Sequence, residues 1–460
     1  MGNVKRKLGV LTTTGILAAM PALETTAHAE ETPDFPLNEI NAEEAEGEYY
    51  VPSSVENIHW GDLPNRESQA VESIQSGETV TFDTVSHEGI LEDQGRDPVE
   101  YFSQHGIEED QVLEEAKEIT ASNIEHDFED HGPHVVTGPV EVKGAEPGDV
   151  LKVEVMSLTP RVPYGVISNR HYKGALPEEF PENEGPEEGA SAENPELYNN
   201  VSTFTPIEQR NGEWMAEIPG EDVYFPIDPF MGLMGVASDT DEYVNSVPPS
   251  ETGGNIDINE LGVGSTLYLP VEVAGAMFYT GDPHFAQGDG EVALTALEGS
   301  LRGTFRLTVL EDGEESIPGE NDTFDQPFGE TDDYWIPIGL DEDLDEAMKE
   351  STRESIDFLS EELGMDRAKA YAYLSAATDY EVSQVVDKTK GIHALIQKAH
   401  FDEKINQDEM PAEETEHTES EEEGGGELPD TSTNTILYIL LGTLLAFGSG
   451  LWLFQKKRSV

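Results

Sequence analysis

Apolar and polar residues alternate in four segments of the central part of the chain. These are SGETVTFDTV (76–85), PGDVLKVEV (147–155), VGSTLYLPVEV (263–273) and GTFRLTVL (303–310). The first three begin with a glycine-containing turn, and a period of two places alternate side chains on one face of a strand. The pattern therefore predicts strands with one buried face, arranged as a sandwich or barrel-like set of sheets.

From about residue 340 the period of the pattern becomes helical. Apolar residues recur there at Leu344, Met348, Ile356, Leu359 and Leu363. Gly364 is expected to end this helix, and a second helix is predicted from Asp366 as its N-cap, followed by a strand around Val382 to Val386. The fold class predicted is α+β, predominantly β with helices late in the chain, as one unit over 50–402. Two closely packed halves are the alternative.

The N-terminus has the composition of a secretory signal. Three basic residues within the first seven are followed by a short apolar stretch, and Ala27 and Ala29 supply small residues at the usual cleavage spacing. We therefore predict a signal peptide over 1–29, a mature chain that begins near Glu30, and a linker over 30–49. An N-terminal membrane anchor is disfavoured because three threonines interrupt the apolar run.

The C-terminal sequence predicts a surface anchor. An apolar run over 436–454, about long enough to span a bilayer, precedes a basic tail (455–460) expected in the cytoplasm. Just before it, LPDTS (428–432) resembles the LPxTG sorting signal of Gram-positive surface proteins. The resemblance implies cleavage after Thr431 by a sortase and attachment to peptidoglycan. Serine replaces the final glycine, and a plain transmembrane anchor is the alternative. Either anchor places the protein outside the cell, on the wall or plasma membrane of a Gram-positive bacterium.

Charge and cysteine content narrow the function. Lys and Arg number 25 and Asp and Glu 96, a formal net charge of −71, which repels nucleic-acid phosphates and argues against nucleic acid as a partner. Part of this charge lies in 403–427, predicted to be a disordered stalk, and in 177–196, predicted to be a surface loop. The chain has no cysteine, which excludes a thiol nucleophile.

The stretch TGDPHFAQGDGE (280–291) concentrates candidate chemistry. Asp282 and His284 share one face if the segment is extended, and Asp289 and Glu291 repeat this spacing after a glycine-bracketed turn. A metal ion held by histidine and carboxylates lowers the pKa of bound water, and a glutamate that is not a ligand can move the proton. The spacing matches neither an HExxH helix nor an EF-hand loop, so a metal site and a solvated hairpin turn both remain open.

A histidine-rich segment, HDFEDHGPHVVTGP, occupies 126–139. We interpret His126 and His131 as part of a polar loop. His134 directly precedes two valines and is the better candidate for a cleft.

Two glycine-containing segments, 225–237 and 247–258, carry isolated acids, including Asp257. Gly253 and Gly254 fit either backbone donors to an oxyanion or a tight turn between core strands.

Taken in order, four segments resemble the acetamidase/formamidase family: VTGPVEVKGAEPGDVLKVEV, FPIDPFMGLMGVA, VPPSETGGNIDINELGVGSTLYLPVEVAGAMF and TGDPHFAQGDGEVALTALEG. The segment from DLDEAMKE to GIHALIQKA is similar to the C-terminal part of that family, so the resemblance runs from about His59 to Phe401. It implies hydrolysis of short linear amides such as formamide or acetamide to a carboxylate and ammonia. It also implies a β-rich fold that often forms a homodimer, and an associated metal ion, with zinc and calcium both known.

The family motifs map onto His134, Asp257, Asp282, His284, Asp289 and Glu291 of this sequence. On this resemblance we predict that His134, Asp282 and His284 hold a divalent metal ion, zinc with calcium as the alternative. We assign Glu291 as the general base and Asp257 as a residue that supports Glu291. Asp289 is assigned a structural role. The segment 84–116 and the loop 177–196 depart from the family pattern, which leaves the exact amide open.

The leading hypothesis is a surface-anchored amidohydrolase. The absence of cysteine, and of the glycine/serine-rich stretch of serine-lysine amidases, favours a metal-activated water. The alternative is a non-catalytic surface binding or adhesion protein on the same scaffold, with a structural calcium site.

Overall fold

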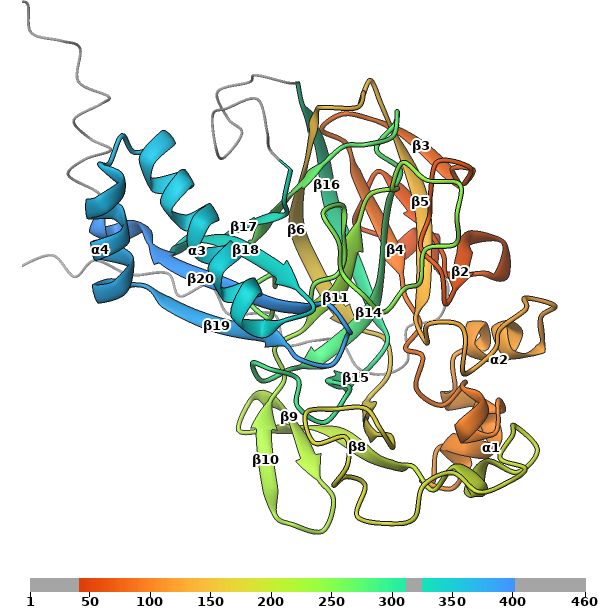
Figure 1. Cartoon of the computed structure of the whole chain (residues 1–460). Helices are drawn as coiled ribbons and strands as arrows, with labels where there is room; N and C mark the ends of the chain where they lie inside the picture. Colours follow the sequence, from red (N-terminus) through yellow and green to blue (C-terminus); the bar gives the residue numbers. More distant parts are fainter. Residues whose placement is uncertain (1–40, 312–324, 402–460) are drawn as a thin grey trace, which may run out of the picture. The chain divides into compact units, whose positions relative to one another are not determined.

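Strands dominate the part of the chain that the computed structural model describes, residues 41–311 and 325–401 (Figure 1). The predicted signal peptide, stalk, sorting motif, transmembrane segment and basic tail lie outside these residues. Among the described residues, no helix is both long and apolar enough to cross a membrane.

The first sheet has nine strands, in the order β1 (Tyr49–Val51), β4 (Thr79–Asp83), β16 (Leu301–Leu310), β6 (Val150–Pro160), β13 (Thr266–Pro270), β17 (Phe328–Glu330), β18 (Tyr334–Asp341), β20 (Lys390–Gln397) and β19 (Asp379–Gln384). The four alternating segments of the sequence correspond to β4, β6, β13 and β16, as predicted. In β6, Leu151, Val153 and Val155 are buried, whereas Lys152 and Glu154 between them are partly exposed.

The second sheet has eleven strands. Its main path is β10 (Val223–Pro226), β9 (Glu213–Ile218), β8 (Val201–Arg210), β7 (Tyr164–Asn169), β15 (Leu297–Glu298), β14 (Phe278–Ala286), β11 (Phe230–Gly235) and β12 (Gly253–Asn255). Three further strands join it through β5 (Val135–Lys143), which pairs with β14, with β2 (Ile58–Trp60) and with β3 (Glu72–Gln75).

Strand β14 lies at the centre of the second sheet. It pairs with β5, β11 and β15, and eight of its nine residues are buried. The first half of TGDPHFAQGDGE is therefore a core strand, and its interpretation as a solvated hairpin turn is wrong.

The two sheets pack face to face through aromatic side chains. The ring of Phe278 on β14 lies 5.7 Å from the ring of Phe82 on β4 and 5.7 Å from the ring of Phe305 on β16. All three side chains are fully buried. The predicted sandwich-like β core is thus confirmed.

The two longest helices come late in the chain, as predicted: α3 (Leu344–Glu361) and α4 (Arg367–Ala377). The side chain of Asp366 accepts a hydrogen bond from the Lys369 amide at 3.2 Å, so it is the expected N-cap. The strand predicted around 382–386 begins earlier, as β19. Two short helices, α1 (Pro98–Ser103) and α2 (Glu114–Ala121), were not predicted; α1 lies within the segment 84–116, and α2 begins in it. The acidic stretch 177–194 carries neither a named strand nor a helix.

Candidate active site

The five predicted site residues lie together at the buried end of β14 and the segments around it. Asp282 and His284 are on β14, His134 immediately precedes β5, Asp257 follows β12, and Glu291 follows the turn after β14. Each is less than a tenth exposed. The structure therefore brings together in space residues that are separated by up to 157 positions in the sequence.

Asp282 is the centre of this group. Its Oδ1 lies 3.4 Å from His87 Nδ1 and 3.7 Å from His134 Nε2, and its Oδ2 lies 3.0 Å from His284 Nε2. One carboxylate thus faces three imidazoles, with one oxygen directed to each side.

A glycine on the neighbouring strand leaves room for this arrangement. A Cβ at Gly232 of β11 would lie 2.7 Å from His284 Cε1 and 2.9 Å from Asp282 Oδ2. Any side chain at position 232 would displace the site, so the FMGLMG strand is fitted to the carboxylates that pack against it.

His134 is oriented by a hydrogen bond on the far side of its ring. Its Nδ1 lies 2.9 Å from Ser246 Oγ and 3.1 Å from the Ser246 carbonyl oxygen. Donation of the Nδ1 proton to Ser246 leaves the lone pair of Nε2 directed at Asp282. Metal-binding histidines are typically oriented in this way. Burial lowers the pKa of His134 to about 4, which keeps the ring neutral at physiological pH.

His87 is held by a charged network behind it. Its Nε2 lies 3.3 Å from Glu88 Oε1, which is 2.8 Å from Arg170 Nη1. Arg170 also contacts Asp93 at 2.7 Å. Burial alone would lower the pKa of His87, but the facing carboxylates of Asp282 and Glu88 outweigh it and raise that pKa to about 10.

Three acids crowd together on the other side of His284. Donor oxygens of Asp257, Glu291 and Asp387 lie within 4.8 Å of one another, all buried. Burial, followed by the neighbouring carboxylates, raises the pKa of Asp257 and Glu291 well above ordinary values, and burial raises that of Asp387 to about 8. This side of the site therefore retains protons that exposed carboxylic acids would lose. Asp282 differs: the adjacent imidazoles overcome the effect of burial and lower its pKa.

The unpaired atoms of this cluster fit a divalent cation. His87 Nδ1, Asp282 Oδ1, His284 Nδ1 and Asp257 Oδ1 are buried, and none has a hydrogen-bond partner. Buried polar atoms without partners are costly, at about 1–3 kcal/mol each. They form two donor groups that share Asp282, one with His87 and His134 and one with Asp257 and His284. Imidazole and carboxylate donors suit zinc.

A cavity of about 470 Å³ opens onto this cluster. Its lining includes six of the cluster residues: His87, His134, Asp282, Glu291, Glu298 and Asp387. His126 and His131 also line it, but the His126 ring stacks on Trp60 with centroids 4.3 Å apart and its Nε2 lies 2.9 Å from the Gly132 carbonyl oxygen. The loop role predicted for His126 agrees with these contacts.

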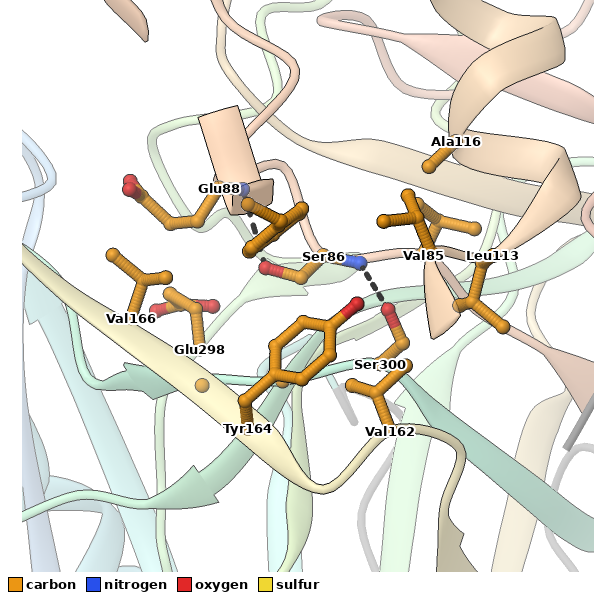
Figure 2. A pocket seen from close by; sticks show the side chains of 14 residues that line it. Val85, Ser86, Glu88, Leu113, Ala116, Val162, Tyr164, Val166, Glu298 and Ser300 are labelled. Atoms are coloured by element: carbon orange, nitrogen blue, oxygen red, sulfur yellow. Dashed lines mark hydrogen bonds between the residues drawn. The ribbon is translucent and has the colours of Figure 1, made fainter. Parts of the chain in front are cut away.

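A second, much smaller cavity borders the site (Figure 2). Its volume is about 20 Å³, and Glu88 and Glu298 line it together with apolar side chains such as Val162 and Val166. The Ser86 amide donates to Ser300 Oγ at 3.0 Å, and the Glu88 amide donates to Ser86 Oγ at 3.2 Å. This space holds about one water molecule and is too small for an amide substrate.

Three members of the cluster were missed by the sequence analysis: His87, Glu298 and Asp387. His87 lies in the segment 84–116, which was interpreted only as a departure from the family pattern. Glu298 lies 3.2 Å from His284 Nε2 and forms part of β15. Its one sequence signal is a lone acid between apolar residues and glycine in ALEGS.

The backbone of Gly253 has a structural role. Its amide donates to the Ser250 carbonyl at 3.0 Å, and a Cβ at this position would collide with the Met234 carbonyl oxygen. Its φ of +90° is also a conformation that favours glycine. Of the two interpretations, the tight turn is therefore supported at Gly253.

Comparison with known proteins places these features in a family. Residues 97–243 and 240–402 match the Acetamidase/Formamidase family model, and residues 420–460 match the LPXTG cell wall anchor motif. The chain is 28% identical over 282 residues to a candidate formamidase of Schizosaccharomyces pombe, covering 53% of this chain and 62% of that protein. It is 29% identical over 253 residues to a formamidase of Methylophilus methylotrophus, covering 47% and 61%. The chain thus spans about three-fifths of the length of these curated relatives.

The fold is also shared with a solved structure. The acetamidase of Bacillus halodurans superposes with a TM-score of 0.58 at 26% identity, over 77% of this chain and 99% of that one.

Proposed function

Because this chain belongs to the acetamidase/formamidase family, we propose that it hydrolyses short linear amides, of the formamide or acetamide class, to a carboxylate and ammonia. The observation that carries the proposal is the set of buried, unpaired imidazole and carboxylate atoms around Asp282, which lines a cavity of about 470 Å³ together with His87. A cavity of this size accommodates a small amide with room to spare.

We assign His134, Asp282 and His284 as ligands of a divalent ion, zinc with calcium as the alternative, and add His87 because it shares Asp282 with His134. Such an ion, when bound, activates a water molecule and polarises the amide carbonyl. The neutral ring of His134 and the ionised carboxylate of Asp282 are the protonation states that metal binding requires. The facing carboxylates raise the pKa of His87 and of His284, so these two rings would release a proton when the ion binds.

Glu291 is the residue that moves the proton. Its raised pKa makes its carboxylate, once ionised, a stronger base than an exposed glutamate. Glu291 lines the cavity with Glu298, and one donor atom of each lies within 4.8 Å of a ring nitrogen of His284. It takes a proton from the attacking water and returns it to the leaving nitrogen, which departs as ammonia. Asp257 and Asp387 support Glu291 in this role, because their nearby carboxyl groups keep the affinity of Glu291 for a proton high.

The activity is proposed to operate outside the cell. The matched anchor motif over 420–460 supports attachment at the surface of a Gram-positive bacterium. The proposal includes removal of residues 1–29 as a signal peptide. It also includes cleavage of LPDTS by a sortase, followed by linkage to peptidoglycan. Finally, we propose that the protein forms a homodimer.

The test is ammonia release by the purified full-length protein from formamide, acetamide and longer primary amides. We expect release from at least one short amide, loss of activity after chelation, and recovery with added zinc. Recovery with calcium alone would identify the other ion. No release from the whole panel in the presence of both metals would contradict the proposal.

A further inference from the structure

A second group of imidazole and carboxylate side chains lies outside the cavity. Glu260 follows β12, Asp289 lies in the turn after β14, Glu381 is on β19, and His393 is on β20. One donor atom from each lies within 4.8 Å of the others. None of the four lines the cavity of the active site.

His393 is fully buried and points into this group. Its Nε2 lies 3.1 Å from Glu260 Oε2 and 3.9 Å from Glu381 Oε2. Neither His393 Nε2 nor Glu260 Oε2 has a hydrogen-bond partner, although both atoms are buried. On the far side of the ring, Nδ1 lies 2.8 Å from Ser383 Oγ, which can accept the ring proton and leave the Nε2 lone pair free.

The shortest of these separations, between His393 Nε2 and Glu260 Oε2, is close to that between two ligands of one ion. In a tetrahedral zinc site with bonds of about 2.0–2.1 Å, neighbouring donor atoms are roughly 3.3 Å apart. His393 Nε2 and Glu260 Oε2 face each other at ion-pair distance without the geometry of a hydrogen bond, and a cation between them would take both as ligands.

The charges in the group also require a partner. Three carboxylates meet one imidazole, and no lysine or arginine belongs to the group. Carboxylates this close to one another repel when they are ionised. A divalent cation removes the repulsion and satisfies both unpaired atoms.

We propose that Glu260, Asp289, Glu381 and His393 form a second divalent-cation site, separate from the active site and structural in role. An imidazole among four ligands indicates zinc or a related transition metal, because calcium prefers six to eight oxygens. Asp289 is exposed and Glu381 is about a third exposed, so the ion can enter from solvent.

The position of the site gives it a consequence for the active site. It links the turn that carries Asp289 to the β19–β20 hairpin, where the Gly290 amide donates to the Ser383 carbonyl and the Val385 amide donates to the Gly290 carbonyl, each at 3.2 Å. Glu291 lies two residues after Asp289, and Asp387 lies three residues after the end of β19. The cation thus fixes the two segments that supply these acids to the cavity.

The test measures zinc bound per chain in the full-length protein, by titration and elemental analysis. Glu381→Gln and His393→Gln are each expected to bind one zinc ion fewer than the wild type. His400→Gln is the matched control: it removes an imidazole seven residues from His393 that contacts Tyr373 instead, and it should bind as much zinc as the wild type. Equal zinc content in all four proteins would overturn the proposal.

A second measurement distinguishes loss of the cation site from misfolding of a variant, and it does not depend on amide hydrolysis. In an Asp282→Asn background, which disables the active-site donors, added zinc should still raise the melting temperature and slow amide exchange at Gly290. Both effects should disappear in Asp282→Asn/Glu381→Gln. A zinc-induced shift of the same size in the single and the double variant would contradict the second site.

Discussion

The protein contains two clusters of the same kinds of side chain, and they differ in their surroundings. The cluster around Asp282 is buried throughout and faces a cavity of about 470 Å³. The cluster around His393 has two members that reach solvent, and none that lines that cavity. The imidazole and carboxylate donors alone do not show which cluster is catalytic and which is structural. The catalytic cluster is distinguished by a substrate-sized cavity and by an acid, Glu291, that lines this cavity without being assigned as a metal ligand.

Energetics support the same distinction. Several buried atoms of the Asp282 cluster lack hydrogen-bond partners, which costs about 1–3 kcal/mol for each atom. A fold retains such a cost where a ligand removes it or where the reaction needs reactive groups. In the His393 cluster, one cation bound to four ligands accounts for the unpaired atoms, and no acid is left over for chemistry.

The largest effect is expected at the acid that belongs only to the first cluster. Glu291→Gln should lower kcat for amide hydrolysis by roughly 10²–10⁴-fold, because the amide cannot take a proton from water. Zinc content should not fall. Asp289→Asn, two residues away, is the control and should cost less than about tenfold. Equal kcat losses in the two variants would remove the difference in role between the clusters.

The next effect concerns a histidine that the sequence analysis missed. His87→Gln should weaken zinc binding in the Asp282 cluster by roughly 10–100-fold, since it removes a donor 3.4 Å from Asp282 Oδ1. Competition with a metal indicator measures this affinity. His126→Gln changes another histidine of the cavity, but one stacked on Trp60, and its affinity should match the wild type. If His126→Gln weakened binding as much as His87→Gln, the ligand assignment would be wrong.

The strands differ in how clearly the sequence pattern predicts them. Alternation predicted β4, β6, β13 and β16 because one face of each meets the core and the other is more polar. Strand β14 is buried on both faces and contains glycine, aspartate and proline, so its local signal is that of a turn. Its strand conformation depends on pairing with β5 and β11, which spacing along the chain does not show.

The site was predictable to the same degree. His134, Asp282, His284 and Glu291 came from motifs of the family resemblance. His87, Glu298 and Asp387 lie in segments that only the tertiary fold brings to the cavity. No periodicity along the chain links His87 to a strand about 195 residues further on.

A smaller effect on activity is expected from the second cluster. Glu381→Gln should reduce kcat by roughly two- to tenfold, because loss of the cation loosens the segments that carry Glu291 and Asp387 without removing a reacting group. Steady-state kinetics with zinc in excess check this. A loss as large as that of Glu291→Gln would indicate that the second cluster takes part in the reaction directly.

The smallest expected effect lies in neither cluster and tests the electrostatics of the fold. Burial and the nearby acids Asp325 and Glu350 raise the pKa of Glu354 on α3 to about 7. A raised carboxyl pKa means that the folded state binds this proton more tightly than the unfolded state, so stability falls as pH rises from about 4.5 through 7. Glu354→Gln should therefore stabilise the protein by up to about 1 kcal/mol at pH 8, with no difference below pH of about 4.

Thermal unfolding at the two pH values measures this change. Glu346→Gln on the same helix loses an exposed ion pair with Lys349 and should gain nothing. A gain for Glu354→Gln that is equally large at low pH would assign the effect to something other than its charge.

The central claim is that the cluster around Asp282 hydrolyses small amides, and zinc titration of chelator-stripped protein tests it most directly. Ammonia release from formamide or acetamide is measured as zinc is added to the wild type and to Asp282→Asn. We predict that the wild type regains activity with the first equivalents of zinc and that Asp282→Asn stays at least about 10³-fold lower at every zinc concentration. Equal activity in the two proteins, or full activity of the stripped wild type without added metal, would contradict the account.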